Sequence, residues 1–315
     1  MKILVSDPLS NVGIEIFKNT PGFEVDVKTD LSPDELEDII GVYHGLSIRS
    51  KTSVNENLIA KAKNLKVIGR AGIGLDNVDI PAATKADVAV MNTPFGNAIT
   101  TAEHTIAMMM ALSRNIPKAT ATLKDGKWEK KQLRGREIFN KTLGLVGVGN
   151  IGGIVADRAI GLKMNVIGYD PYQSDESISE IGVKPAAFEE VLTQSDYISI
   201  HTPKTRETTN LFNKKTLYRM KPGAMLINCA RGGIVNEDDL YDALKNNHLG
   251  GAALDVFETE PPGKISLMEL DNFICSSHLG ASTHEAQENV ARDVATQIVA
   301  YLQTGSAENI VNLKK

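Results

Sequence analysis

The sequence contains few of the features that indicate metal sites, disulfide bonds, membrane insertion or nucleic-acid binding. Only two of its 315 residues are cysteine, Cys229 and Cys275, and no CxxC pair occurs, so neither a disulfide framework nor a metal site is indicated. No apolar run approaches the length that spans a bilayer, and the opening MKILVSD lacks the features of a signal peptide. The formal net charge of −5 provides no basic surface for nucleic acid. We expect a cytoplasmic protein with no nucleic-acid or membrane partner.

The chain is long enough for two domains. Short apolar runs alternate with helical patterns along its whole length, which predicts parallel sheets with helices on both faces. A long helix is expected from Thr101 to about Gly126, a second at Thr283–Gln303, and a last short strand at 311–313. Further strands are expected at Ile3–Ser6, Phe23–Val27, Leu46–Arg49, Val67–Gly72, Val88–Met91, Tyr197–Ile200, Ala224–Asn228, Ala252–Val256 and Phe273–Cys275.

The stretch from Leu143 to Asp170 combines a strand, a tight turn, a helix and a second strand that ends on a carboxylate. Gly147 permits the turn, Gly149 lets the backbone approach a pyrophosphate, and Gly152 lets the helix pack closely on the strand. The pyrophosphate then sits on free N–H groups at the positive end of the helix dipole. Asp170 can accept hydrogen bonds from an adenosine ribose, and its charge repels a 2′-phosphate. The pattern predicts a site for NAD in preference to NADP.

Three candidate residues, Arg231, Glu260 and His278, come shortly after expected strands, which are in turn Ala224–Asn228, Ala252–Val256 and Phe273–Cys275. The carboxyl ends of parallel strands are where α/β sheets bind ligands. Arginine can clamp a carboxylate with two parallel hydrogen bonds. Histidine can exchange a proton with a hydroxyl or carbonyl oxygen as hydride moves. A carboxylate beside the histidine holds its tautomer. The three residue types together suit hydride transfer between a 2-hydroxy acid and a 2-keto acid.

Two glutamates compete as the partner of His278. Glu260 directly precedes Pro261 and Pro262, whose rings stiffen the backbone there, and we therefore choose Glu260 over Glu258. The sequence reveals no convergent partner for the remaining histidines, which are His44, His104, His201, His248 and His284.

From about Ile48 to about Gln287 the chain resembles the D-isomer-specific 2-hydroxyacid dehydrogenases. The motifs GRAGIGLDNVD, MNTPFGNAIT, KDGKWEKK, GVGNIG, NCARGGIV, AALDVFETEPP and HLGAST follow one another in the order of that family. The resemblance implies that Arg231, Glu260 and His278 are the catalytic arginine, glutamate and acid/base histidine. It implies substrate contacts by Arg49, Arg70, Asn97 and Arg231. It also implies cofactor contacts by Asn150, Ile151, Thr202, Cys229, Ala230, Arg231, Asp255, His278 and Gly280.

The same resemblance implies the domain organisation. A doubly wound Rossmann domain over 99–286 would bind NAD, and a flavodoxin-like α/β domain formed by 1–98 and 287–315 would bind substrate. Ile73 stands where related enzymes often carry a threonine. We expect a short form, without the C-terminal regulatory domain that many relatives carry after this region.

The expected activity is NAD-dependent oxidation of a phosphorylated 2-hydroxy acid, because Arg49, Arg70 and Arg231 suit a substrate with two acidic groups. A glyoxylate or hydroxypyruvate reductase on the same fold is one alternative, and an NAD-sensing protein like the transcriptional corepressors of this fold is another. We also expect a homodimer built on the Thr101–Leu123 helix and the arm through Trp128, since that helix is apolar around most of its circumference.

Overall fold

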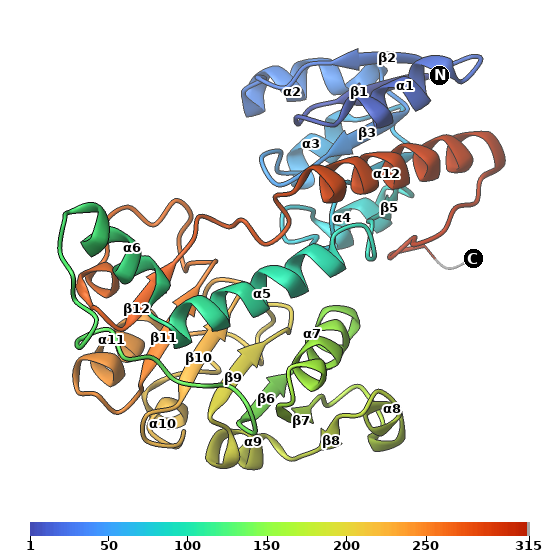
Figure 1. Cartoon of the computed structure of the whole chain (residues 1–315). Coiled ribbons are helices and arrows are strands. Elements are labelled where there is room, and N and C mark those ends of the chain that lie inside the picture. The colour runs from blue at the N-terminus through green and yellow to red at the C-terminus, as the bar shows by residue number, and fades with distance from the viewer. Residues whose placement is uncertain (314–315) are drawn as a thin grey trace. The chain divides into compact units, whose positions relative to one another are not determined.

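The computed structural model describes residues 1–313 and divides the chain into two compact units (Figure 1). Unit 1 comprises Met1–Asn97 and Ala281–Lys315, and unit 2 comprises Ala98–Gly280. The expected junction at 286–287 falls inside helix α12 (His284–Thr304), all of which belongs to unit 1. Residues 314 and 315, which end the expected substrate domain, lie outside the described residues. Within residues 1–313, no helix is long and apolar enough to cross a membrane.

Unit 1 is built on a five-stranded parallel sheet in the order β2-β1-β3-β4-β5, which is the flavodoxin order. The predicted flavodoxin-like α/β fold is therefore confirmed for this unit. Its strands are β1 (Lys2–Val5), β2 (Glu24–Val27), β3 (Gly45–Ile48), β4 (Val67–Arg70) and β5 (Ala89–Met91). Its helices are α1 (Asn11–Asn19), α2 (Pro33–Ile39), η1 (Ile40–Val42), α3 (Glu56–Lys61), α4 (Ile80–Lys85) and α12.

Helix α12 covers one face of this sheet with an apolar stripe. A Cβ placed on Gly69 of β4 would lie 2.6 Å from side-chain atoms of Val294 and Ile298, so glycine allows the helix to approach the strand closely. The expected strand at 311–313 is wrong, because only one isolated bridge forms there, between Met91 and Ile310. Beyond this bridge a side chain replaces the backbone as the partner of β5, because the Asn312 side-chain oxygen accepts the N–H of Val90 at 2.8 Å.

Unit 2 contains a seven-stranded parallel sheet in the order β12-β11-β10-β9-β6-β7-β8. Read from its other edge this is the Rossmann order 3-2-1-4-5-6 with one added strand, so the predicted doubly wound fold is confirmed. Its strands are β6 (Thr142–Val146), β7 (Asn165–Tyr169), β8 (Lys184–Pro185), β9 (Tyr197–Ile200), β10 (Met225–Asn228), β11 (Gly251–Leu254) and β12 (Phe273–Cys275). Its helices are α5 (Ala98–Ser113), α6 (Ile116–Lys124), α7 (Asn150–Gly161), α8 (Asp175–Glu180), α9 (Phe188–Gln194), α10 (Lys214–Leu217), α11 (Glu237–Lys245) and η2 (Ser266–Glu269).

The single long helix expected from Thr101 is wrong. The structure has two helices, α5 and α6, separated by a break at Asn115, whose φ of 54° is left-handed. Pro117, near the start of α6, has no N–H to continue the hydrogen-bond ladder of α5. The chain therefore turns at the end of α5.

The central strands of unit 2 are buried on both faces, as expected for parallel strands between helical layers. Residues of α5 and α7 share one core cluster on the first face, and residues of α9, α10 and α11 share another on the second. Helices thus cover both faces of the sheet, and the carboxyl ends of the strands are left for ligands.

Candidate active site

The glycine-rich turn after β6 is shaped by close backbone contacts. Gly147 has a φ of 95°, and a Cβ placed on it would lie 2.6 Å from the carbonyl oxygen of His201. A Cβ on Gly152 would overlap the carbonyl oxygen of Gly147. Gly149 differs, since none of the described atoms outside its own residue and its chain neighbours lies within 4 Å of its Cβ position. The protein therefore requires glycine at two of these positions, and at the third it leaves room for a ligand to approach the backbone.

The start of α7 fits a pyrophosphate. Gly149 caps the helix and has no side chain with which to cap the first N–H groups, so these donors are available to an anion. The hydroxyl oxygen of Thr202, after β9, is buried and has no hydrogen-bond partner among residues 1–313. Unsatisfied buried donors are unusual in folded proteins. Both features fit a bound dinucleotide that supplies the missing acceptors.

Asp170, directly after β7, lies beside the turn. One of its carboxylate oxygens accepts the N–H of Val148 at 2.8 Å, and the other accepts the N–H of Tyr172 at 2.9 Å. The carboxylate thus stabilises the glycine-rich turn. Asp175 and Glu190 line the same surface pocket as Asp170, so its walls are acidic. An acidic pocket disfavours the extra phosphate of NADP.

A buried asparagine shapes the loop that carries Arg231. Asn228, the last residue of β10, is 1% exposed, and its side chain accepts the N–H of Ala230 at 3.0 Å and donates to the carbonyl of Arg231 at 2.9 Å. The Arg231 guanidinium donates to the carbonyl of Ala230 at 2.6 Å. Sequence reasoning missed Asn228, although a polar residue that ends a fully buried strand could have indicated it.

Glu260 and His278 form a direct pair. Glu260 Oε2 lies 2.6 Å from His278 Nδ1, and Oε1 accepts the N–H of Phe257 at 3.0 Å. Because Nδ1 faces the carboxylate, Nε2 is the ring nitrogen that remains for a substrate. Glu258 faces elsewhere, and its Oε1 accepts the N–H of Glu237 at 3.0 Å. The geometry therefore places Glu260, and not Glu258, against the histidine.

The loop that carries His278 is held by Asp255, a fully buried carboxylate after β11. Its oxygens accept the N–H groups of Leu279 at 2.7 Å and Gly280 at 2.8 Å, and its carbonyl accepts the N–H of His278 at 2.8 Å. His278 adopts a φ of 55° in this loop. Asp255 thus binds the backbone N–H groups of three consecutive residues that begin with the histidine.

Ser276 and His104 complete the surroundings of Asp255. The Ser276 hydroxyl donates to Asp255 Oδ1 at 2.6 Å, and His104 Nε2 lies 3.0 Å from that hydroxyl and 3.3 Å from Oδ1. Burial alone would raise the pKa of Asp255, but these hydrogen bonds and those from the loop outweigh burial and hold the pKa below its usual value. His104 therefore has partners that no pattern in the sequence revealed.

Two further polar residues at this edge are unsuited to proton or nucleophilic chemistry. Burial and the nearby Asp255 raise the pKa of the Cys229 thiol to about 12, so it stays protonated. Burial lowers the pKa of His201 to about 4, and its Nε2 lies 2.9 Å from the Ser199 hydroxyl. Cys229 can offer its backbone to a cofactor, and His201 is a neutral packing residue.

In unit 1, Arg49 and Arg70 lie at the carboxyl ends of adjacent strands. Arg70 ends β4 and pairs in register with Ile48, the residue before Arg49. The Arg70 guanidinium lies against Gly72, where a Cβ would overlap it, and the φ of 143° at Gly72 also favours glycine. Asn97, the third residue expected to bind substrate, is 9% exposed at the end of this part of the unit.

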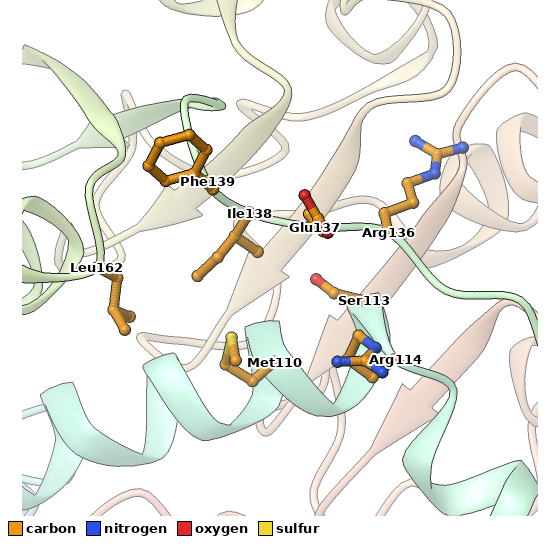
Figure 2. Close-up of a pocket in the computed structure, with 8 residues that line it drawn as sticks. All are labelled: Met110, Ser113, Arg114, Arg136, Glu137, Ile138, Phe139 and Leu162. Atoms are coloured by element: carbon orange, nitrogen blue, oxygen red, sulfur yellow. The ribbon is translucent and has the colours of Figure 1, made fainter.

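The pocket drawn in Figure 2 lies elsewhere on unit 2. It is lined by residues at the end of α5 and by Arg114 directly after it, by the segment 136–139 before β6 and by Leu162 before β7. Segments that precede parallel strands lie at the amino edge of a sheet. This pocket, of about 210 Å³, therefore belongs to the edge opposite the glycine-rich turn and contains none of the expected site residues.

Comparison with known proteins agrees with the fold. The model of the D-isomer specific 2-hydroxyacid dehydrogenase, NAD binding domain, matches residues 106–280, more than half of the chain. A solved structure of the TT0316 protein from Thermus thermophilus is 32% identical, with a TM-score of 0.91 over 99% of this chain and 100% of that one. The chain belongs to the D-isomer-specific 2-hydroxyacid dehydrogenase family, and its Rossmann unit is an NAD-binding domain.

Curated relatives narrow the resemblance within that family. The chain is 49% identical over 312 residues to a D-3-phosphoglycerate dehydrogenase of Synechocystis, covering 99% of this chain and 56% of the relative. It is 46% identical over 314 residues to the D-3-phosphoglycerate dehydrogenase of Archaeoglobus fulgidus, covering 99% of this chain and 59% of the relative. The chain thus spans somewhat more than half the length of the curated relatives that it matches.

Proposed function

We propose that the chain is an NAD-dependent D-3-phosphoglycerate dehydrogenase, which interconverts D-3-phosphoglycerate and 3-phosphohydroxypyruvate in the first step of serine biosynthesis. The observation that carries the proposal is the pair formed by Glu260 and His278, 2.6 Å apart, on the same sheet edge as a turn built for a dinucleotide. The similarity to D-3-phosphoglycerate dehydrogenases over 99% of the chain supports the choice of substrate.

The geometry of unit 2 supports the catalytic roles that we propose for its residues. NAD, held at the glycine-rich turn of Gly147, Gly149 and Gly152, would supply the acceptor for the hydride that leaves the carbon bearing the substrate hydroxyl. His278 Nε2 takes the hydroxyl proton as the carbonyl forms, and in the reverse direction it returns that proton. Glu260 orients the ring through Nδ1 and stabilises the positive charge that the ring then carries. Arg231 holds the substrate carboxylate with paired hydrogen bonds.

The binding residues of the proposal follow the resemblance and the geometry. Arg49, Arg70 and Asn97 of unit 1 would contact the substrate together with Arg231. The cofactor would be held by Gly147, Gly149, Asn150, Ile151, Gly152, Asp170, Thr202, Cys229, Ala230, Arg231, Asp255, His278 and Gly280. The contacts of Asp255 in the structure are with the protein itself, so we assign it the part of holding the loop beside the cofactor.

A substrate panel followed by NADH absorbance tests the proposal. Removing the phosphate, as in D-glycerate, should lower kcat/KM at least about a hundredfold, because charge-assisted hydrogen bonds to the phosphate would be lost. Equal kcat/KM values for D-glycerate and D-3-phosphoglycerate would favour the hydroxypyruvate reductase. If no 2-hydroxy acid is turned over while NADH still binds, the chain would be a sensor and not an enzyme.

We also infer a homodimer in the cytoplasm. Helix α6 has no buried residue, yet it carries Ile116 and Leu123, which are 53% and 57% exposed, and Trp128 on the following arm is 80% exposed. Exposed apolar side chains on neighbouring segments indicate a surface that another protein covers, and a second copy is the commonest partner. Phe139, also exposed, borders the pocket of Figure 2. Both cysteines are free, as in a reducing compartment.

A further inference from the structure

A buried carboxylate of unit 1, Asp7, is not among the residues proposed to contact substrate or cofactor. Asp7 follows β1 and is 1% exposed. Its Oδ2 accepts the N–H of Arg49 at 2.6 Å and that of Thr52 at 3.1 Å, and its Oδ1 accepts the hydroxyl of Thr52 at 2.7 Å. All three donors belong to the loop 49–52 after β3. Burying a carboxylate is unfavourable unless it accepts hydrogen bonds, and the donors to Asp7 all come from this one loop.

Asn77 holds the same loop through its carbonyl groups. Its Nδ2 donates to the carbonyl of Arg49 at 2.7 Å and to that of Thr52 at 2.6 Å. The Ser6 hydroxyl lies 2.9 Å from that of Thr52. Both ends of the loop are thus fixed through N–H and carbonyl groups alike, which leaves the loop little conformational freedom.

Arg49 is the residue that this arrangement presents. Its backbone N–H donates to Asp7. Its Nη1 lies 3.5 Å from the carbonyl oxygen of Pro8, the residue that follows Asp7. The segment 7–8 therefore contacts both the backbone and the guanidinium of Arg49. The register of β3 and β4 places this residue beside Arg70 at the carboxyl edge of the sheet.

We propose that Asp7 is a positioning residue, which holds the loop 49–52 in the shape that presents the Arg49 guanidinium to an acidic group of the substrate. The proposal rests on the proposed function, in which Arg49 contacts the substrate. Asp7 is buried and its oxygens are occupied by the loop, so it acts through Arg49. Without Asp7 the loop would be less ordered before substrate binds, and binding would then have to order it. The entropy cost of that ordering weakens substrate binding but does not change the rates of proton and hydride transfer.

Thr52→Val and Asp7→Ala test the proposal in the whole chain with NAD present. We expect KM for D-3-phosphoglycerate to rise about three- to tenfold in Thr52→Val and about ten- to a hundredfold in Asp7→Ala, as lost neutral and charged hydrogen bonds predict. In both variants kcat should stay within about twofold, and the NADH affinity, measured by fluorescence titration, should not change. Thr52→Ser retains the hydroxyl and should restore the wild-type KM.

A matched control uses the same chemical change elsewhere in unit 1. Thr20 donates its hydroxyl to the carbonyl of Ile16 at 2.6 Å at the end of α1. Thr20→Val should leave KM and kcat unchanged, which separates the role of the loop from a general loss of stability.

A double-mutant cycle with Arg49→Ala shows whether Asp7 and Thr52 act through that arginine. If they do, Thr52→Val should add almost nothing to the KM of Arg49→Ala, whereas independent effects would multiply. Multiplying effects, or an unchanged KM in Thr52→Val, would overturn the positioning role. The Thr52→Val variant tests the positioning role even if Asp7→Ala fails to fold.

The proposed function can fail separately. If the wild-type protein turns over only an unphosphorylated 2-hydroxy acid, the proposal for D-3-phosphoglycerate is overturned, and the same variants are then measured with that acid. A rise in KM for it would still support the positioning role of Asp7.

Discussion

His278 adopts a left-handed backbone conformation that few residues other than glycine tolerate, and Asp255 binds both its N–H and that of the following residue, Leu279. The fixed backbone aims the ring so that Nδ1 meets Glu260. At the scale of single residues, the site therefore pairs side chains that would touch ligands with buried side chains that orient them. Asn228 binds the backbone of the loop that carries Arg231, as Asp255 binds the backbone of the loop that carries His278.

Replacing His278 by alanine should remove the proton acceptor and leave the cofactor site intact. We expect kcat to fall about 10²–10⁴-fold, the usual contribution of general acid–base catalysis, with the NADH affinity within about threefold of wild type. Glu260→Gln keeps the side-chain shape but removes the charge opposite Nδ1, so its loss of kcat should be smaller. A fall of less than about fivefold in His278→Ala, with the chemical step shown to be rate-limiting, would exclude the proton-transfer role.

Asp170→Ala should narrow the preference for NAD over NADP. The carboxylate repels a 2′-phosphate, but it also binds the N–H of Val148 in the glycine-rich turn, so the variant should bind both cofactors through a less rigid turn. The ratio of the NADH and NADPH dissociation constants isolates the effect of the charge and should move towards one. Because Asp175 and Glu190 stay in the same pocket, NADPH should not become the preferred cofactor. An unchanged ratio would contradict the role of Asp170 in cofactor choice.

The sequence could propose Arg231, Glu260 and His278 because each follows a strand that its apolar pattern reveals. It could not reveal the residues that orient them. Asp7 meets Thr52 across 45 residues of sequence, and His104 meets Ser276 across 172. Contacts of this kind depend on how strands and helices pack together, and a periodic pattern in one segment carries no information about them.

At the scale of elements, strands buried on both faces were predictable, since parallel strands form continuous apolar runs. Strand β9 occupies the predicted residues 197–200. Two elements differ for local reasons. Strand β8 has only two residues, one of them proline, and so has no pattern to detect. The break between α5 and α6 depends on one left-handed residue, Asn115, inside an otherwise apolar stretch.

The end of β9 provides a prediction on pH. Burial lowers the pKa of His201 from 6.5 to about 4, so the folded protein binds this proton less readily than the unfolded chain. The contribution to stability is complete above pH 6.5, is lost as the pH falls towards 4, and changes no further below that. At pH 5 the loss amounts to about 2 kcal/mol.

His201→Asn should remove this part of the acid sensitivity. We expect the free energy of unfolding in urea to fall less between pH 7.5 and pH 5 in the variant than in wild type, by about 2 kcal/mol. His284 is exposed at the start of α12, and His284→Asn serves as the control that should follow the wild-type curve. Equal pH dependence in His201→Asn and wild type would show that His201 does not titrate as its burial implies.

At the scale of the whole molecule, parallel sheets with helices on both faces follow from alternating strand and helix patterns, but the junction between the units does not. After β12 the chain leaves unit 2 at Gly280 and adds α12 to unit 1, where Val294 and Ile298 pack on Gly69. The apolar stripe of an amphipathic helix indicates that the helix packs against another element. Which of two similar sheets provides that surface is decided by packing with residues more than 200 positions away.

The same reasoning about covered surfaces leads to the oligomeric state. Much of α5 is covered inside unit 2, where Met109 and Leu112 are buried, so the apolar surface that still needs a cover lies on α6 and the following arm. We expect sedimentation equilibrium at micromolar concentration to give twice the chain mass of 34.1 kDa. The double variant Ile116→Glu and Leu123→Glu should sediment as a monomer, because two charges cannot be buried unpaired in an interface. Val42→Glu, at a site 57% exposed in unit 1, is the control that should stay dimeric. A fully active wild-type protein of single chain mass would rule out the dimer and leave α6 as an exposed helix.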